Sequence, residues 1–129
     1  MTSTTTSIST DKAPGAIGPY SQAVRTSNLI FVSGQIPINP ATGTIEATDV
    51  AEQADQVIAN ITAILEAAGS DLSAVVKTTV LLADIADFSS VNEVYSRWFT
   101  THPLPARAAF QVAALPLGAK VEIEAIAAL

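Results

Sequence analysis

The chain has 129 residues, 49% of them hydrophobic, and carries 12 acidic against 6 basic side chains for a net charge of −6. Compact domains usually hold roughly 100–200 residues, so residues 1–129 are expected to form a single domain. The acidic balance disfavours nucleic acid as a partner, because binding a phosphate backbone needs a basic surface. With no cysteine in the sequence, disulfides, thiolate metal sites and a cysteine nucleophile are excluded.

The chain shows no sign of contact with a membrane. No apolar run approaches the ~20 residues that span a bilayer, and the stretch MTSTTTSIST has neither the basic nor the apolar part of a secretory signal. We therefore expect a cytoplasmic protein. Residues 1–12 are rich in Ser and Thr without apolar periodicity, which predicts a flexible arm or an edge strand.

Strand and helix signals alternate through the first two thirds of the chain. Residues 29–33 form an apolar β-type run after the polar turn 26–28, which together indicate a hairpin. Residues 49–52 fit a D-x-x-E helix start, and apolar residues then recur at three- and four-residue steps up to a stop at Gly69. Residues 75–82 are rich in β-branched side chains and predict a strand buried on both faces.

A second helix and two more strands follow. Residues 90–93, SVNE, fit a capping box. One apolar helical stripe comes next, made of Val91, Val94, Tyr95 and Trp98, and the pair 102–103, His-Pro, closes the helix. Residues 107–112 and 120–129 look like strands joined by a turn at 116–118, so we expect a terminal hairpin.

The order β-β-α-β-α-β-β indicates the α+β class, with one mixed sheet and two helices on one face. No remaining segment of the sequence can cover the other face of that sheet. We therefore expect the bare sheet face to pack against other copies of the same chain, because large apolar surfaces are seldom left exposed.

Charged residues on the last two strands are candidates for chemistry. Alternation along residues 120–129 places Lys120, Glu122 and Glu124 on one face, and the expected hairpin brings Arg107 within a few positions of them. One interpretation is a cross-strand ion pair. The other is a cleft in which Arg107 holds a substrate carboxylate with both arms of its guanidinium, while a glutamate handles a water proton. The pattern leaves both interpretations open.

Four weaker signals each have a structural alternative. Tyr20 follows a stiff Gly-Pro turn that could aim its hydroxyl into a pocket, or it could be a packed aromatic. Asn92 lies at the expected helix start, where capping would explain it. Ser33 and Gly34, at a strand end, could present a hydroxyl and backbone N–H groups or serve as ordinary turn residues.

Metal and nucleotide sites find no support in the sequence. The single histidine, His102, lies before a proline and can build neither a metal cluster nor a Ser-His-Asp triad. The glycines at 15 and 18 lack the lysine and the following Ser or Thr of a P-loop. We expect no metal and no cofactor.

Five motifs occur along the chain in a fixed order, namely AIGPYSQA, VSGQIP, VNEVY, PARAAF and VEIEAIA. In this order and spacing they resemble the RidA/YjgF family, whose members include reactive-intermediate deaminases, and the resemblance runs from residue 13 to residue 127. It implies a chorismate-mutase-like fold in a barrel-like homotrimer with ligand clefts between subunits. It also implies hydrolysis of 2-imino acids and their enamines, such as 2-iminobutanoate and 2-iminopropanoate, to 2-oxo acids and ammonia without a cofactor.

The resemblance also implies roles for individual residues. Arg107 matches the arginine that grips the substrate carboxylate, and Glu122 matches the glutamate proposed to position or activate water. Further matches to pocket positions are Tyr20, Ser33 and Asn92, with Gly34 beside Ser33 and with Tyr20 also a catalytic candidate. Ala109 departs from the family pattern, because many members carry cysteine there, so a mechanism that needs a thiol is excluded.

Three alternative functions remain open at this point. The protein could bind 2-oxo acids or other small carboxylates through Arg107 without turnover. It could share the RNA-cleaving or translation-inhibiting activity attributed to some relatives, which the acidic balance disfavours. It could also act as a holdase that uses exposed apolar surface.

Overall fold

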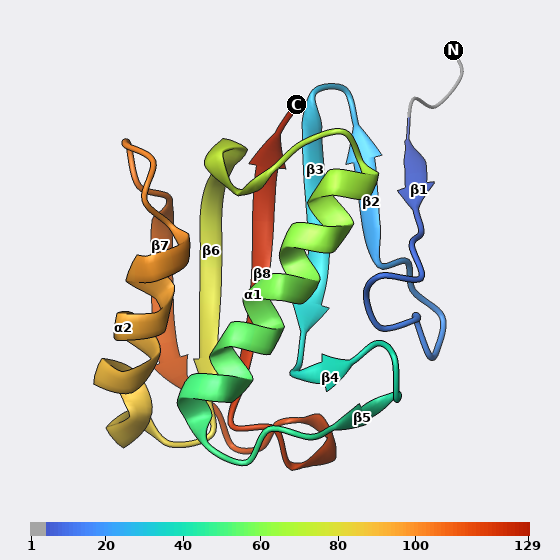
Figure 1. The fold of residues 1–129 in the computed structure, drawn as a ribbon. Coiled ribbons are helices and arrows are strands. Elements are labelled where there is room, and N and C mark those ends of the chain that lie inside the picture. Colours follow the sequence, from blue (N-terminus) through green and yellow to red (C-terminus); the bar gives the residue numbers. More distant parts are fainter. Residues whose placement is uncertain (1–4) are drawn as a thin grey trace.

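The computed structural model describes residues 5–129, which form a mixed β-sheet with two α-helices (Figure 1). The main sheet has the strand order β1-β2-β3-β8-β6-β7. Its strands are β1 (Thr6–Ile8), β2 (Ala23–Thr26), β3 (Leu29–Gln35), β6 (Val75–Leu82), β7 (Ala106–Gln111) and β8 (Val121–Ala128), and a separate small pair is formed by β4 (Ile38–Asn39) and β5 (Thr44–Ile45). Strands β6 and β7 are parallel, and the other neighbours in the main sheet are antiparallel. The predicted α+β class is confirmed.

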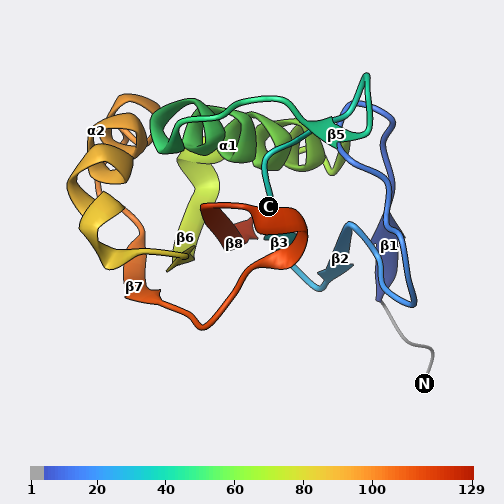
Figure 2. The same cartoon turned by 90° about the horizontal axis from the view of Figure 1, so that it is seen from below.

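Both helices, α1 (Val50–Ala67) and α2 (Phe88–Trp98), lie on the same face of the sheet (Figure 2). Helix α1 begins as predicted, since the Asp49 carboxylate accepts a hydrogen bond of 2.8 Å from the Glu52 N–H. It ends before Gly69, whose φ of 83° is readily adopted only by glycine. Within residues 5–129, no helix has both the length and the apolar character that a membrane crossing requires.

The core lies between the helices and the sheet. Helix α1 contributes a fully buried stripe consisting of Val57, Ile58, Ile61, Ile64 and Leu65. The sheet packs against this stripe with alternate residues of its central strands, namely Ile30, Val80, Leu82, Val121 and Ile123. Each such side chain contributes roughly 1.5–3 kcal/mol by leaving water, so this layer supplies most of the driving force for the fold.

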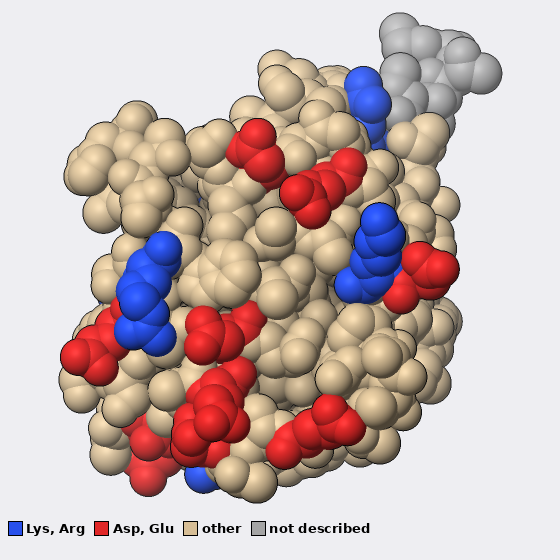
Figure 3. Space-filling model, viewed as in Figure 1, with Lys and Arg blue, Asp and Glu red and all other residues tan. Residues whose placement is uncertain are grey.

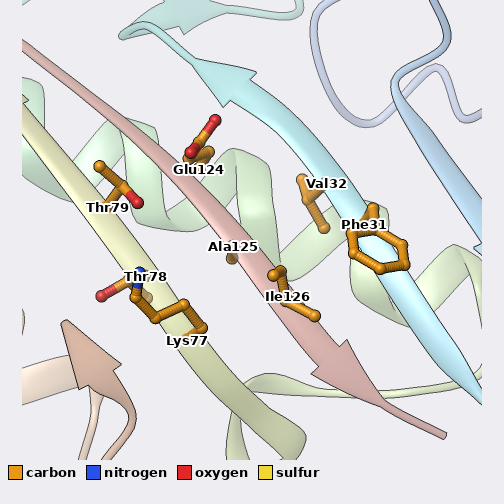
Figure 4. Close-up of a pocket in the computed structure, with 8 residues that line it drawn as sticks. All are labelled: Phe31, Val32, Lys77, Thr78, Thr79, Glu124, Ala125 and Ile126. Carbon is orange, nitrogen blue, oxygen red and sulfur yellow. The ribbon is translucent and has the colours of Figure 1, made fainter. Parts of the chain in front are cut away.

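The opposite face of the sheet is not covered by any element of the described chain (Figure 2). Strand β6 therefore alternates between buried and partly exposed residues, and the prediction that both of its faces are buried is wrong for the single chain. The bare face carries a hollow of about 210 Å³. Apolar, polar and charged side chains border it together, among them Phe31, Ile126, Thr79, Lys77 and Glu124 (Figure 4).

The predicted terminal hairpin of β7 and β8 is wrong. Strand β6 lies between them, parallel to β7 and antiparallel to β8. The reason is that β6, α2 and β7 form a β-α-β unit, whose crossover returns the chain to lie parallel beside the strand it left. The short distance in sequence between β7 and β8 therefore does not translate into pairing.

The predicted start of α2 at Ser90 is also wrong. The helix begins at Phe88, directly after a short 3₁₀ turn, Ile85–Asp87. The capping interaction belongs to that turn, because the Asp84 carboxylate accepts a hydrogen bond of 2.9 Å from the Ala86 N–H. Asn92 consequently lies inside the helix, and its side chain is free to serve another purpose.

Candidate active site

Arg107 lies on β7 and extends toward α2, on the helix-bearing side of the sheet. Its Nη1 donates a hydrogen bond of 2.8 Å to Asn92 Oδ1. The guanidinium carbon lies 4.8 Å from the centre of the Tyr95 ring and 5.5 Å from that of Phe88. A guanidinium has five N–H donors, and Arg107 is exposed, so donors beyond the one given to Asn92 are accessible to an anion. Asn92 thus orients the arginine and does not cap the helix.

The Tyr95 ring packs beneath the Arg107 guanidinium and supports it. Its hydroxyl lies 2.7 Å from Thr78 Oγ1, and the Thr78 side chain is fully buried. Burial raises the pKa of Tyr95 despite the opposing effects of the Thr78 hydrogen bond and the Arg107 charge, so the phenol is neutral near pH 7. The hydrogen bond to Thr78 therefore fixes the Tyr95 ring, and the ring in turn fixes the position of the Arg107 guanidinium.

Removing the Tyr95 hydroxyl tests this support. In Tyr95→Phe we expect the free energy of unfolding to fall by about 1–2 kcal/mol, because Thr78 Oγ1 loses its buried partner while the ring beneath Arg107 is kept. Urea denaturation would measure the change. Tyr20→Phe is the matched control, since its hydroxyl is on an exposed side chain. An equal loss of stability in the control would contradict the assignment.

Glu122 lies on β8 and belongs to the bare face of the sheet. Its carboxylate rests against Gly34, where an added Cβ would overlap Oε2. The β3–β8 pairing is irregular between Val32 and Gln35, and the glycine in that stretch lets the carboxylate approach the backbone. Burial raises the pKa of Glu122 above its ordinary value, and the charge of Glu124 raises it further. A carboxyl group in this condition is suited to accept and return a proton.

A cleft of about 260 Å³ opens beside Gly34. Its lining is mainly apolar and includes Pro14, Ile17, Tyr20, Ile36, Ile38 and Leu117. Tyr20 is 53% exposed and lies in the wall. Ser33 is adjacent, and its hydroxyl donates a hydrogen bond of 2.6 Å to the Ser21 carbonyl, which ties β3 to the segment that carries Tyr20. Gly34 and Tyr20 therefore line one cleft, and Glu122 and Ser33 lie beside it through their contacts with Gly34 and Ser21.

Arg107 and Glu122 lie on opposite faces of the sheet within one chain. Arg107 is opposite Thr78, and Thr78 is opposite Ala125, a buried residue of the helix-bearing face. Glu122 is opposite Leu81, on the bare face. Because cross-strand partners share a face, the predicted closeness of Arg107 to the glutamates is wrong. The sequence-predicted residues thus form two separate groups, one around Arg107 and the other around Glu122.

Comparison with known proteins places the chain in a family. A family model described as Endoribonuclease L-PSP matches residues 10–129. The chain belongs to the Endoribonuclease L-PSP family. The 2-iminobutanoate/2-iminopropanoate deaminase of Homo sapiens is 58% identical over 93% of this chain and 87% of that protein.

Solved structures support the same placement. The YjgF gene product from E. coli is 50% identical, with a TM-score of 0.91 over 95% of this chain and 98% of that one. E. coli TdcF with bound serine is 46% identical, with a TM-score of 0.90 over 96% of this chain and 98% of that one. The predicted RidA/YjgF resemblance is confirmed.

For this member of the L-PSP family, sequence reasoning missed two supporting residues. One is Tyr95, which we expected only as part of an apolar stripe. The other is Gln22, which is buried and donates to the carbonyls of Thr10 and Pro14 at 3.0 and 2.7 Å. Its position in the AIGPYSQA motif was the available signal. Among the described residues, no group of three or more His, Asp or Glu side chains is arranged to hold a metal ion.

Gly34 offers a test of where Glu122 must lie in this L-PSP protein. In Gly34→Ala we expect kcat/KM for an imino acid to fall about 10- to 100-fold, because the new methyl group displaces the Glu122 carboxylate. The free energy of unfolding should change little, since the displaced atoms are the end of a flexible side chain. In a Glu122→Gln background the same substitution should add little further loss. Full additivity of the two losses would show that Gly34 acts elsewhere.

Proposed function

We propose that this protein hydrolyses 2-imino acids, and their enamine tautomers, to 2-oxo acids and ammonia without a cofactor. The observation that carries the proposal is the Arg107 guanidinium, which is held by Asn92 and Tyr95 with donors still accessible. Such a rigid planar fork suits a carboxylate. The name of the human relative gives the same chemistry. We place the activity in the cytoplasm, where amino-acid-eliminating enzymes release these imines.

The complete site is proposed to form between copies of the chain in a homotrimer. Since Arg107 and Glu122 lie on opposite faces, one copy must supply the carboxylate anchor and its neighbour the Glu122 cleft. The bare face supports this assembly, because Phe31 and Phe110 are 42% and 48% exposed there in the single chain. Contact with another copy would remove this apolar surface from water.

The reaction then follows from the position of the groups. Arg107 binds the substrate carboxylate, which places the C=N carbon beside Glu122 of the neighbouring copy. Glu122 takes a proton from water while the water oxygen forms a bond to the imine carbon, and it returns this proton to the imine nitrogen as the C=N π bond opens. In the resulting carbinolamine, Glu122 takes the hydroxyl proton and passes it to the amine nitrogen, so that the C–N bond breaks, the C=O group forms and ammonia leaves. Positioning supplies much of the rate, and proton transfer the rest.

The remaining candidates take supporting parts in this scheme. Asn92 orients Arg107, and Gly34 makes room for the Glu122 carboxylate. Ser33 fixes the wall of the cleft through Ser21, although its oxygen can still accept a further hydrogen bond. Tyr20 lies in the wall of the cleft and is partly exposed, so it can contact the substrate.

The alternatives have less support. The family description mentions an endoribonuclease, but acidic side chains outnumber basic ones on the helix-bearing face (Figure 3) and the net charge is −6. Such a surface repels an RNA backbone. Binding without turnover would need Arg107 but not the raised pKa of Glu122. A holdase role would use the bare face, which the proposed assembly covers.

The decisive experiment follows ammonia or 2-oxo acid release from 2-iminobutanoate and 2-iminopropanoate, each generated in situ. We expect the protein to accelerate both reactions well above the uncatalysed rate. Saturable ligand binding without acceleration would replace the proposal with a carboxylate-binding role. RNA cleavage that survives stringent purification and disappears in Arg107→Ala would favour the nuclease alternative, and suppression of client aggregation would favour the holdase.

A further inference from the structure

Ile17 and Leu117 are the two most exposed large hydrophobic side chains of residues 5–129, at 88% and 73%. A single exposed aliphatic residue is ordinary on a protein surface. These two, however, line the same cleft of about 260 Å³, and Ile36 and Ile38 line it with them. The cleft therefore has an aliphatic rim that no part of the described chain covers.

The backbone at Leu117 gives a second, independent sign. Leu117 has φ 56° and ψ 23°, in the left-handed region that bulky residues rarely adopt. Glycine or asparagine would occupy this position with less strain. Since the side chain is also largely exposed, neither local backbone preference nor core packing accounts for a leucine here. Strain of this kind concentrates at ligand sites.

The wall that carries Ile17 is built in advance. Gln22 Nε2 donates to the carbonyls of Thr10 and Pro14, at 3.0 and 2.7 Å, and Gln22 Oε1 accepts from the Thr10 N–H at 2.7 Å. The Gln22 side chain is 4% exposed, so these bonds are shielded from water. The segment leading to Ile17 is therefore anchored before any ligand arrives.

We propose that Ile17 and Leu117 form a subsite for the side chain of the substrate, which makes 2-imino acids with branched aliphatic side chains better substrates than 2-iminopropanoate. This inference rests on the proposed function. Gly34 belongs to the cleft and contacts Glu122, so an imine carbon beside that carboxylate lies next to the cleft that Ile17 and Leu117 line. Each methylene buried there favours the longer substrate by about fourfold.

The test compares kcat/KM for two imino acids generated in situ by an L-amino-acid oxidase, one from leucine and the other from alanine. We expect the wild type to prefer the leucine-derived imine by about tenfold or more. Leu117→Asn keeps a residue that tolerates positive φ but removes the aliphatic group, and should lower this ratio about fivefold. Ile17→Thr, at an exposed position, should act in the same direction. Leu129→Asn is the matched control at the far end of β8 and should leave the ratio unchanged.

The outcomes separate the two proposals. A wild-type protein that hydrolyses both imines without preferring the longer one, or a ratio unaffected by both Leu117→Asn and Ile17→Thr, overturns the subsite and leaves the deaminase standing. A fall in the ratio with Leu129→Asn as large as that with Leu117→Asn also overturns it. Absence of turnover with either imine overturns the proposed function itself, and the subsite with it.

Discussion

Arg107→Ala should lower kcat/KM for 2-iminobutanoate by about 100- to 1,000-fold, because the substrate carboxylate loses two charge-assisted hydrogen bonds. Most of the effect should appear in KM if the anchor only binds, and in kcat as well if it also places the imine carbon. Arg107 is exposed, so the folded structure should persist. Measurement of initial rates with far-UV circular dichroism would check both points.

Arg107→Lys is the informative companion variant. Lysine keeps the charge but not the planar fork, and it loses much of the match to the Asn92 amide and the Tyr95 ring. We expect an activity between those of Arg107→Ala and the wild type. A variant with alanine that is folded and fully active would remove Arg107 from the mechanism, and equal activity of lysine and wild type would reduce its role to that of a charge.

Glu122→Gln should lower kcat by about 100-fold or more while changing KM less than threefold, since proton transfer at a positioned group typically contributes 10²–10⁴-fold. The amide is nearly isosteric, so the contact with Gly34 survives and only the proton carrier is lost. Glu66→Gln, on the exposed end of α1, is the matched control for removal of one negative charge. Loss of binding with unchanged kcat would make Glu122 a ligand contact instead.

The same substitution should stabilise the protein at neutral pH. Because the pKa of Glu122 is raised in the folded state, the native protein holds this proton more tightly than the unfolded chain. Stability therefore falls as pH rises from the ordinary value of 4.5 through the raised one, and stays lower above it. Glu122→Gln lacks this loss. Its thermal midpoint should exceed that of the wild type at pH 7, and the difference should disappear below pH 4.5.

Much of the fold could be predicted from local patterns. Helix α1 has a cap at Asp49, an unbroken apolar period and a glycine stop, and all three act within a few residues. The β-branched residues of β6 are enough to predict where this strand lies. The predictions that were wrong concern strand pairing, which depends on segments far apart in the sequence. The position of β7 follows from the crossover through α2, and no property of residues 107–112 specifies a parallel neighbour.

The sequence predicts candidate site residues but not how they are arranged. Arg107, Glu122 and Glu124 are charged residues on largely apolar strands, which makes them candidates, and only the family resemblance singles out Glu122. The separation of Arg107 from Glu122 follows from the strand order, which places β6 between β7 and β8 and Arg107 on the side of Thr78. The sequence does not identify Tyr95 as a site residue, because its ring fits the apolar stripe of a helix. Only its contacts with Thr78 and Arg107 in the structure show that it supports the arginine.

The placement of Arg107 and Glu122 on opposite faces has a consequence for when activity appears. In the proposed assembly, a newly synthesised chain folds with Arg107 and Glu122 in place but does not contain a complete active site. Turnover then depends on encounter with further copies, so specific activity should decline on dilution without any unfolding. The rate of imine hydrolysis per chain therefore depends on the concentration of the protein, and isolated chains are inactive.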